Sequence, residues 1–425
     1  MAKAALVIGG GIAGIQSALD LADQGFKVYL VEKNPSIGGK MAQLDKTFPT
    51  LDCAACIMTP KMVDAGRHPN IELLAYSEVH NIKKDGDVFK VNIVRKPRYV
   101  DETKCTGCGV CAQHCPVEAP NEFDEMLGLR KAIYVPFPQA VPLIYTIDKD
   151  SCIDCGLCEK VCQAKAVDRQ QQPRGVEAEV GAVIVSTGFG LFDAREKEEY
   201  GHGIYPNVIT GLTLERLLSA SGPTGGHIVR PSDGKIPRSV SFVQCVGSRD
   251  EKSGNLYCSR VCCMYATKEA ILLKEHVPEI DETIFYMDIR AYGKGFEEFY
   301  QRAKQEFGIN FVRGRVAEIT EDSRTQNLFL TVENTETGEI LEHEADLVVL
   351  STGFVAPRDE GLAKILPVPV GDDGFLVASN LKTDPVTTEI EGVLIAGTVE
   401  GPKDIPDTVI QASAAAMKAS NFLID

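Results

Sequence analysis

The chain has 425 residues, 44% hydrophobic and 24% charged, which is an ordinary composition for a globular protein of two or three domains. Its formal net charge of −16 argues against nucleic acid or an anionic membrane surface as a direct partner. No apolar run approaches the roughly 18 residues needed to cross a bilayer, so we expect no direct membrane span.

The N-terminal residues follow a strand–turn–helix–strand pattern. A strand is predicted over residues 4–8, a helix follows it, and a second strand over residues 27–31 ends at Glu32. Glycines in the turn allow a pyrophosphate to reach the helix N-terminus, and the acid accepts hydrogen bonds from a ribose hydroxyl. A glycine-rich turn that binds nothing is the alternative, but the register of strand, helix and acid favours a dinucleotide. The turn has the spacing Gly-x-Gly-x-x-Gly, at Gly9, Gly11 and Gly14.

Later glycines favour FAD as that dinucleotide. Two glycines follow the acid, and the buried strands predicted over residues 181–187 and 346–350 are followed by Gly188 and by Ser351-Thr352-Gly353. This arrangement resembles the two-dinucleotide-fold flavoproteins related to thioredoxin and glutathione reductases, in which such strands return the chain to the FAD domain. The resemblance implies an FAD site at Gly9, Gly11, Gly14, Glu32, Lys33, Gly38, Gly39, Thr187, Gly188, Gly353 and Gly397.

One position departs from this resemblance. The relatives have a late Gly-Asp pair whose acid holds the flavin ribityl chain, and the corresponding residues here are Gly397 and Thr398. Asp404 and Asp407 are candidate replacements for that acid.

The segment that would bind a nicotinamide dinucleotide lacks a glycine fingerprint. The strand predicted over residues 239–243 runs into a turn with a single glycine, Gly247, and Cys245 stands where the phosphate turn should be. We therefore expect that NAD(P)H is not the reductant.

The 14 cysteines fall into four tight groups separated by long stretches without cysteine. Grouped thiols in a long chain indicate metal ligation in a reducing compartment rather than a disulfide framework. We therefore expect a cytoplasmic protein.

Two of the groups repeat the Cys-x2-Cys-x2-Cys-x3-Cys run of bacterial ferredoxins. In such proteins the first three cysteines of a run bind one [4Fe–4S] cluster and the fourth binds the other. A zinc ribbon, the alternative, uses paired Cys-x2-Cys units. We predict one cluster on Cys105, Cys108, Cys111 and Cys162, and a second on Cys152, Cys155, Cys158 and Cys115.

A third group, Cys245-x12-Cys258-x3-Cys262-Cys263, is not a ferredoxin pattern. If the chain is helical from Ser259, Cys258 and Cys262 share one helix face and Cys263 points about 100° away. The spacing leaves open a third [4Fe–4S] cluster, a disulfide between adjacent cysteines, and buried thiols that pack as small hydrophobic groups.

These features together resemble the A subunits of the heterodisulfide reductases. The resemblance rests on the eight-cysteine segment, the third cysteine group, and the runs Phe48-Pro49-Thr50-Leu51-Asp52-Cys53-Ala54-Ala55-Cys56 and Thr59-Pro60-Lys61-Met62. It covers essentially the whole chain. It implies FAD in a thioredoxin-reductase-like core, an inserted ferredoxin domain, and a third [4Fe–4S] cluster on Cys245, Cys258, Cys262 and Cys263.

Family members pass electrons to or from partner subunits, and some bifurcate them at the flavin. The resemblance implies an FAD- and iron–sulfur-dependent oxidoreductase subunit of anaerobic energy metabolism. Its expected partners are other subunits of such a complex, a ferredoxin, a hydrogenase or a sulfur-metabolism reductase. The layout is similar to the A subunit of the quinone-interacting membrane-bound oxidoreductase, so we expect a short form attached to the inner face of the membrane through a partner. Lys268 becomes a candidate for a place beside the flavin, whereas its pattern alone favours a solvated helix face.

Cys53 and Cys56 are left over once three clusters take twelve cysteines. They are similar in position to the redox disulfide of glutathione reductase relatives, with two intervening residues instead of four. Three alternatives remain open for this pair: a redox or structural thiol role, a role as metal ligands, or neither of these. With Lys268 they are the candidate catalytic residues. Beside the leading electron-transfer function stand a soluble disulfide reductase that uses these two cysteines and a passive electron-wiring subunit.

The predicted fold class is α/β, a thioredoxin-reductase-like two-dinucleotide-fold flavoprotein with an inserted ferredoxin-like α+β domain. We expect an FAD-binding domain in three pieces (1–100, 169–235 and 346–425), the ferredoxin domain (101–168), and a degenerate NAD-type domain with the third cluster (236–345).

Overall fold

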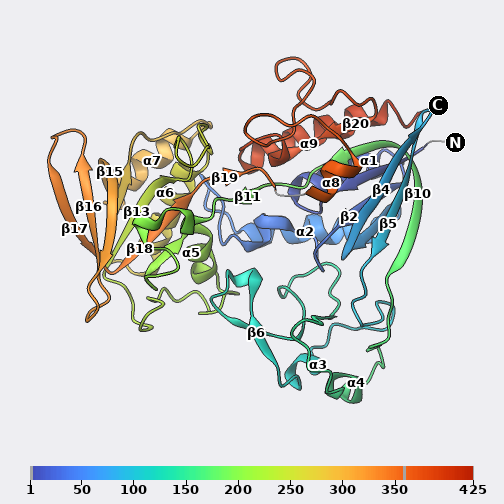
Figure 1. Ribbon diagram of the computed structural model, residues 1–425, viewed down its shortest axis with the longest axis horizontal. Helices are drawn as coiled ribbons and strands as arrows, with labels where there is room; N and C mark the ends of the chain where they lie inside the picture. Colours follow the sequence, from blue (N-terminus) through green and yellow to red (C-terminus); the bar gives the residue numbers. More distant parts are fainter. Residues whose placement is uncertain (1–2, 358–359, 425) are drawn as a thin grey trace. The chain divides into compact units, whose positions relative to one another are not determined.

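The computed structural model describes residues 3–357 and 360–424, and the chain divides into two compact units (Figure 1). The first unit is made of three pieces, within residues 1–42, 55–189 and 356–425. The second unit is made of residues 43–54 and 190–355. Each unit is built on its own seven-stranded sheet.

The first sheet has a parallel core extended by an antiparallel pair. Its strands, in sheet order, are β3 (Ile71–Ala75), β2 (Val28–Glu32), β1 (Ala4–Ile8), β10 (Arg174–Val185), β5 (Val88–Arg95) and β4 (Ser77–Asp85), with β20 (Val393–Ile395) beside β10. β1 pairs in parallel with β2 and β10, and β10 also pairs in parallel with β20. β5 is antiparallel to both β10 and β4. β20 is fully buried and β1 nearly so, which explains their continuous apolar runs.

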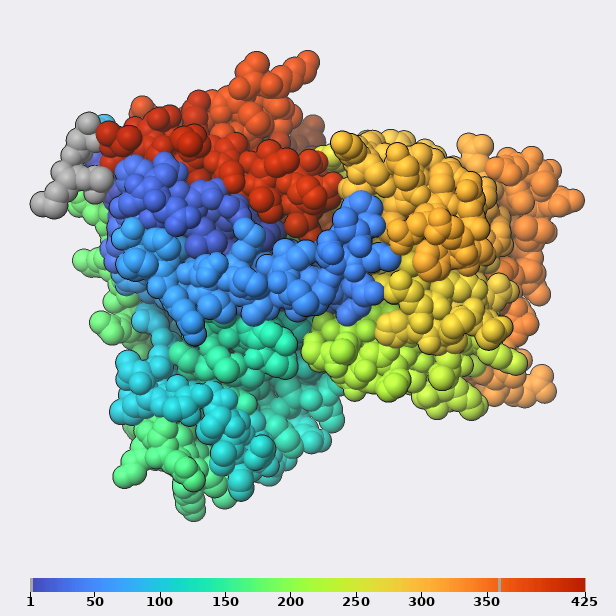
Figure 2. All heavy atoms as spheres, turned by 180° about the vertical axis from the view of Figure 1, so that it is seen from behind, coloured from blue at the N-terminus to red at the C-terminus, as the bar shows by residue number. Residues whose placement is uncertain are grey.

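Two helices from opposite ends of the chain cover one face of this sheet, α1 (Ile12–Asp23) and α9 (Ile405–Ser420). They lie side by side, α1 in blue and α9 in red in Figure 2. The contact is close because α9 presents small buried side chains such as Ala415 and Ala416, and Ser17 Oγ donates to the Ala412 carbonyl oxygen at 3.0 Å. This packing fixes α1, and with it the glycine turn that precedes it.

Residues 98–168 form a cysteine-rich segment within the first unit. Its elements are α3 (Val110–Gln113), β6 (Glu118–Pro120), β7 (Leu129–Lys131), β8 (Ile133–Tyr134), β9 (Thr146–Ile147) and α4 (Leu157–Val161). Arg98 is 1% exposed and anchors the segment. Its guanidinium donates to the Pro35 carbonyl oxygen at 2.7 Å, to Thr146 Oγ1 at 2.9 Å and to Glu102 Oε1 at 3.0 Å. The segment is therefore tied directly to the loop after β2.

The second sheet is parallel over its first five strands and antiparallel over the last two pairings. Its order is β12 (Val208–Thr210), β18 (Leu347–Thr352), β13 (Ser239–Val246), β14 (Asp281–Tyr286), β15 (Asn310–Glu321), β16 (Leu328–Asn334) and β17 (Ile340–Ala345). The unit also contains the helices α5 (Gly211–Leu218), α6 (Cys262–His276) and α7 (Phe296–Gln305).

The remaining elements are short, apart from the 14-residue helix α2. They are α2 (Ala54–Arg67), α8 (Glu360–Ile365), β11 (Gly190–Leu191), β19 (Phe354–Val355), and the 3-10 turns η1 (Gly39–Gln43), η2 (Glu122–Asp124), η3 (Ala194–Glu196), η4 (Glu198–Tyr200) and η5 (Gly397–Val399). No helix within residues 3–357 and 360–424 has both the length and the hydrophobicity to cross a membrane.

The second unit comprises residues 43–54 and 190–355, whereas the expected NAD-type domain covered residues 236–345. β12 pairs with β18, and β18 pairs with β13, so two strands expected in the FAD-binding part lie in the second sheet. Both sheets contain apolar strands that end in a turn of small residues. This sequence pattern therefore does not indicate to which sheet a strand belongs.

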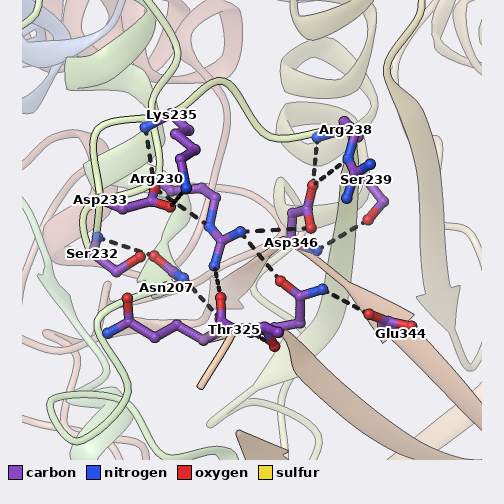
Figure 3. A network of polar contacts seen from close by, with 12 residues as sticks. Asn207, Arg230, Ser232, Asp233, Lys235, Arg238, Ser239, Thr325, Glu344 and Asp346 are labelled. Carbon is purple, nitrogen blue, oxygen red and sulfur yellow. Dashed lines mark hydrogen bonds and ion pairs between the residues drawn. The ribbon is translucent and has the colours of Figure 1, made fainter. Parts of the chain in front are cut away.

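A polar network fixes the amino ends of β13 and β18 (Figure 3). Asp346 is 5% exposed, precedes β18 and accepts the Arg238 N–H at 2.7 Å. Its Oδ1 lies 3.7 Å from Arg230, which donates in turn to Asn327 Oδ1 at 3.2 Å and to the Thr325 carbonyl oxygen at 2.9 Å. The network therefore has a structural role at the amino ends of these strands. A functional site is expected at the opposite, carboxyl edge of the sheet.

Candidate FAD and iron–sulfur sites

The glycine turn between β1 and α1 forms an open cradle at a helix N-terminus. Gly9 has a φ of 110°, and a Cβ there would stand 2.3 Å from the Ser186 carbonyl oxygen. A Cβ at Gly14 would fall 1.8 Å from the Gly9 carbonyl oxygen, so the turn lies tightly against both the end of β10 and helix α1. At Gly11, which immediately precedes α1, a Cβ would meet nothing within 4 Å, and no side chain caps the helix. The first N–H groups of α1 are therefore accessible, which fits a pyrophosphate.

Glu32 lies beside this cradle at the end of β2 and is 6% exposed. Its Oε2 accepts the Gly10 N–H and its Oε1 the Asn34 N–H, each at 2.8 Å. Burial raises the pKa of the Glu32 carboxyl above its ordinary value. Each oxygen keeps a further lone pair, which fits a ribose hydroxyl as donor. Gly38 donates to the Gly10 carbonyl oxygen at 2.7 Å, so the next glycine pair packs on the same turn.

Other predicted FAD residues gather at the carboxyl ends of the first sheet. Thr187 and Gly188 follow β10, and a Cβ at Gly188 would lie 3.9 Å from Thr398 Oγ1. Gly397 follows β20, and a Cβ there would stand 2.8 Å from Ala13 of α1. The structure thus brings together the β1, β10 and β20 strand ends that the sequence pattern assigns to FAD. Exposed residues near the turn are Lys33 and Gly39.

Two residues at Gly397 were not predicted. Gln411 Oε1 accepts the Gly397 N–H at 2.8 Å, and Lys403 Nζ donates to the Gly397 carbonyl oxygen at 3.0 Å. A single glutamine in an alanine-rich helix carries no sequence signal that could have identified it. Asp404 is the N-cap of α9 and accepts the Asp407 N–H at 2.8 Å.

Gly353 lies in the second unit. A Cβ there would stand 2.8 Å from Ser248 Cβ and 3.0 Å from Ser259 Oγ, which are neighbours of the third cysteine group. Its contact with FAD stays a prediction.

The second ferredoxin run encloses a cavity with the last cysteine of the first run. The cavity is lined by Cys115, Cys152, Cys155 and Cys158 together with apolar side chains such as Ile133 and Ile147. Backbone N–H groups point at the sulfurs, because Asp154 donates to Cys152 Sγ at 3.4 Å and Glu159 donates to Cys158. This arrangement fits the crossed ligation of a two-cluster ferredoxin, with the fourth ligand supplied by the other run.

The first run gathers around Cys111, which interacts electrostatically with Cys105 and Cys108. Burial raises the pKa of the Cys111 thiol to about 12, so ligation would displace a firmly held proton. Cys162 packs against the same small core, and its Sγ accepts the Ala166 N–H at 3.3 Å. The ligand set of this cluster stays a prediction.

No three His, Cys, Asp or Glu side chains among residues 3–357 and 360–424 are arranged to hold a single metal ion. A four-iron cubane takes one thiolate at each of its four iron atoms, so its ligands surround a volume rather than a point.

The third cysteine group comes together at the carboxyl edge of the second sheet. Cys245 lies on β13, Cys262 and Cys263 open α6, and Cys258 lies in the loop before it. All four are free, and each interacts electrostatically with the other three. Carboxyl ends of parallel strands are where open α/β sheets bind ligands, so these thiols occupy the edge where a phosphate turn would lie. The group therefore fits a cluster.

The helix that carries this group begins later than the sequence suggested. Cys258 and Cys262 do not share a helix face, since α6 starts at Cys262. Arg260 has a left-handed backbone with φ 62°, which a helix does not accept. Its N–H instead donates to Cys258 Sγ at 3.3 Å.

Cys53 and Cys56 form a disulfide, whereas the other twelve cysteines are free. The pair lies at the start of α2, which begins at Ala54. A disulfide outside the three cysteine groups is consistent with a redox or structural role for these two thiols.

Lys268 lies on α6, and its side chain is 1% exposed, which excludes the solvated helix face. Its Nζ is paired with Glu215 of α5 and donates to the Lys46 carbonyl oxygen at 3.0 Å. Glu269 adjoins this pair, and burial together with the Glu215 charge raises its pKa well above the ordinary value. The position of Lys268 beside a flavin stays a prediction.

Similar solved structures and family models define the class. Thioredoxin reductases from Lactococcus lactis and T. acidophilum each superpose with a TM-score of 0.55 at 16% identity, over 99% of this chain and 99% and 98% of theirs. The FAD dependent oxidoreductase model matches residues 5–99, and the 4Fe-4S binding domain model matches residues 98–121 and 145–168. The chain thus has the thioredoxin-reductase-like fold, with an N-terminal segment that matches FAD dependent oxidoreductases and with 4Fe–4S motifs.

Curated relatives are similar to nearly the whole chain. The chain is 61% identical over 417 residues to the A subunit of the H(2)/formate:CoB-CoM heterodisulfide,ferredoxin reductase of Methanococcus maripaludis, over 97% of this chain and 63% of that protein. It is 59% identical to an iron-sulfur A subunit of the CoB--CoM heterodisulfide reductase of Methanopyrus kandleri, over 99% of this chain and 64% of that protein. The chain is therefore similar over nearly its whole length to A subunits of heterodisulfide reductases, and it spans less than two thirds of the length of these relatives.

Proposed function

We propose that this chain is the iron–sulfur flavoprotein subunit of a multi-subunit oxidoreductase, in which electrons pass between FAD, [4Fe–4S] clusters and partner subunits. One observation carries the proposal: a dinucleotide cradle and a crossed pair of ferredoxin runs belong to the same compact unit. When bound, the flavin supplies the exchange between two-electron and one-electron chemistry.

Residues 141–143 of the cysteine-rich segment, which we call the strap, support electron transfer between the FAD cradle and the first cysteine run. Ile37 donates to the Val141 carbonyl oxygen at 3.0 Å, and the Val141 N–H donates to Ser36 Oγ at 2.8 Å, so the strap is hydrogen-bonded to the loop after Glu32. Two residues further on, Leu143 lies so close to Gly107 of the first run that a Cβ there would stand 2.9 Å away. Continuous packing therefore joins the cradle to the first cysteine run.

The third cysteine group would hold a further [4Fe–4S] cluster, which makes three. Four free thiols that face one another at the carboxyl edge of the second sheet support it. Electrons would then enter or leave through the ferredoxin pair or through this cluster.

The partners proposed for the chain are the other subunits of a heterodisulfide-reductase-like or quinone-interacting complex, with a ferredoxin, hydrogenase or sulfur-metabolism reductase as electron source or acceptor. A relative at 61% identity is named as part of a heterodisulfide,ferredoxin reductase, which supports the ferredoxin. Twelve free cysteines favour a reducing compartment such as the cytoplasm, where a partner subunit would link the chain to the membrane.

A disulfide reductase is the second candidate function, and the Cys53–Cys56 disulfide is the observation that favours it. Two electrons and two protons would open this bond to two thiols. Turnover of small disulfide substrates by the wild-type chain, lost in Cys53→Ala, would support this candidate against the electron-transfer proposal.

Cofactor content and reduction kinetics test the main proposal. The anaerobically purified chain should hold one FAD and about twelve iron atoms, from three four-iron cubanes. A reduced low-potential ferredoxin should bleach the flavin and reduce the clusters in stopped-flow mixing. A chain that binds no flavin would overturn the proposal, whereas iron near eight atoms (about two cubanes) would remove only the third cluster.

A further inference from the structure

Two guanidinium groups lie beside the third cysteine group, and a single carboxylate holds both of them. Asp288 binds Arg249 through a fork, with Oδ1–Nη1 and Oδ2–Nη2 distances of 2.5 Å and 3.0 Å. It also binds Arg290, with Oδ1–Nε and Oδ2–Nη2 distances of 3.0 Å and 3.2 Å. Two positive charges and one negative charge leave one net positive charge at this position.

Both arginines reach the cysteines. The Arg249 guanidinium interacts electrostatically with the thiol of Cys245, and the Arg290 backbone N–H donates to that of Cys263. Cys263 Sγ lies 3.7 Å from the Asp288 carbonyl oxygen, so both the backbone and the side chain of Asp288 are at the group. Of the two guanidinium groups, Arg249 is the one that interacts with a thiol of this group.

The backbone is built to hold Arg249 in this place. Cys245 and Arg249 both have left-handed φ angles, 61° and 56°, which are uncommon for residues other than glycine and cluster at functional sites. The Arg249 N–H donates to the Tyr257 carbonyl oxygen at 3.0 Å, and Asp250 bridges to Asn255. These contacts close the loop that leads from Cys245 back to Cys258, so the guanidinium is fixed rather than free to sample solvent.

The ferredoxin runs have a different environment. In the part of the chain that the structure describes, the hydrogen bonds to their sulfurs come from uncharged groups, such as the N–H of Asp154 to Cys152 and of Ala166 to Cys162. Cluster potentials depend on net charge, on hydrogen bonds to the sulfurs and on solvent exposure. Charge-assisted hydrogen bonds are also roughly twice as strong as neutral ones. Arg169 lines the cavity of the second run, but its guanidinium binds Asp154. The third group therefore differs from the other two in that a guanidinium interacts with one of its thiols.

We propose that Arg249, whose charge Asp288 partly offsets, raises the reduction potential of a cluster on Cys245, Cys258, Cys262 and Cys263, so that this cluster accepts an electron before the ferredoxin pair. Reduction adds one negative charge to the cluster, and a guanidinium at a ligating sulfur stabilises the reduced state more than the oxidised state. The inference rests on the proposed third cluster. It assigns that cluster the role of electron sink among the three.

A redox titration of the full chain followed by electron paramagnetic resonance tests this role. Arg249→Gln should lower the midpoint of the third cluster, changing its reduced-to-oxidised ratio at fixed potential by about tenfold, or about 59 mV for one electron. Arg249→Lys keeps the charge and should shift it less. Asp288→Asn removes the compensating negative charge and should shift the midpoint upward. Loss of structure alone would not produce shifts of opposite sign.

Arg195→Gln is the matched control. Arg195 forms the same fork with Asp193, at 2.9 Å and 2.6 Å, but its side chain is 71% exposed and the hydrogen bonds found for it go to Asp193 rather than to a cysteine. No midpoint should move in this variant. The signal of the third cluster is identified as the one lost in Cys258→Ser.

Iron content separates the outcomes. Iron near eight atoms, or about two cubanes, in the wild-type chain would overturn both the third cluster and the inference. Full iron in Arg249→Gln with an unmoved third midpoint would overturn the role of Arg249 and leave the cluster standing. If Arg249→Gln loses iron, Asp288→Asn decides: an upward shift supports the inference, and an unchanged or lowered midpoint overturns it.

Discussion

Lys268 of α6 and Glu215 of α5 form an ion pair almost completely excluded from solvent, with side chains 1% and 2% exposed. Both partners also hold the short segment that precedes α2, because Glu215 Oε2 accepts the Asp45 N–H at 2.9 Å and Lys268 Nζ donates to the Lys46 carbonyl oxygen at 3.0 Å. The pair thus joins three pieces of the second unit. Removing one member would leave a buried charge without its partner.

Lys268→Met should therefore destabilise the protein by about 3–5 kcal/mol. This corresponds to a fall of roughly 10 °C in the melting midpoint, measured by circular dichroism under anaerobic conditions. The double variant Lys268→Met with Glu215→Met should recover most of the loss, because both charges are gone. Lys27→Met is the control, since Lys27 and Glu72 form an exposed pair worth about 1 kcal/mol or less. A Lys268→Met midpoint close to that control would contradict the structural role.

Cys258→Ser and Cys262→Ser should each remove about four irons and leave the signals of the ferredoxin pair intact. The reason is that these thiols interact with Cys245 and Cys263 at the carboxyl edge of the second sheet and belong to neither ferredoxin run. Iron analysis and electron paramagnetic resonance measure the two effects. Unchanged iron in both variants would make the group structural.

Cys53→Ala and Cys56→Ala should leave flavin and iron content unchanged, because the two sulfurs bind each other rather than a metal. Non-reducing thiol titration of the denatured chain should show one new free thiol in each single variant. Loss of iron in either variant would instead identify that residue as a ligand.

Local patterns in the sequence were sufficient to predict the elements that carry the glycine turn and the two ferredoxin runs. The strands β1 and β2 lie within one residue of their expected bounds, and α1 follows the glycine turn as expected, because each is defined by an apolar period over consecutive residues. The ferredoxin runs needed only spacing, since short loops confine the thiols of one run to one place.

Non-local pairing could not be predicted in the same way. β12 and β18 are more than a hundred residues apart, and nothing in either strand indicates that they pair with each other and not with β10. Burial of Lys268 was also missed, because its partner Glu215 lies on another helix. No sequence pattern indicated a role for Arg249, because its position near the cysteines depends on a loop that folds back on them.

The stability of the second unit should depend on pH through Glu282 of β14. Its side chain is 2% exposed, neither carboxylate oxygen has a hydrogen-bond partner among the described residues, and burial raises its pKa from 4.5 to about 9. The folded protein then binds a proton that the unfolded chain releases above pH 4.5, so stability falls as pH rises from 4.5 to about 9. The slope is at most about 1.4 kcal/mol per pH unit.

Glu282→Met should flatten this dependence and raise the melting midpoint above pH 6 more than at pH 4. Melting curves between pH 4 and pH 9 measure it, with the exposed Glu342→Gln as the control. A Glu282→Met curve parallel to the wild-type curve would show that Glu282 does not hold its proton in the folded protein.

Neither NADH nor NADPH should reduce the flavin of the isolated chain, whereas dithionite or a reduced low-potential ferredoxin should. A nicotinamide dinucleotide needs bare backbone N–H groups at a glycine turn after the central strand, but β13 continues into Cys245, and α6 opens with Cys262 and Cys263 at that edge. A cluster there would also repel the two phosphates of the dinucleotide, because its thiolates carry negative charge. Stopped-flow mixing with NADH measures bleaching of the oxidised flavin, with dithionite as the positive control. Rapid, stoichiometric bleaching by NADH would mean that the second unit keeps a nucleotide site beside its cysteines.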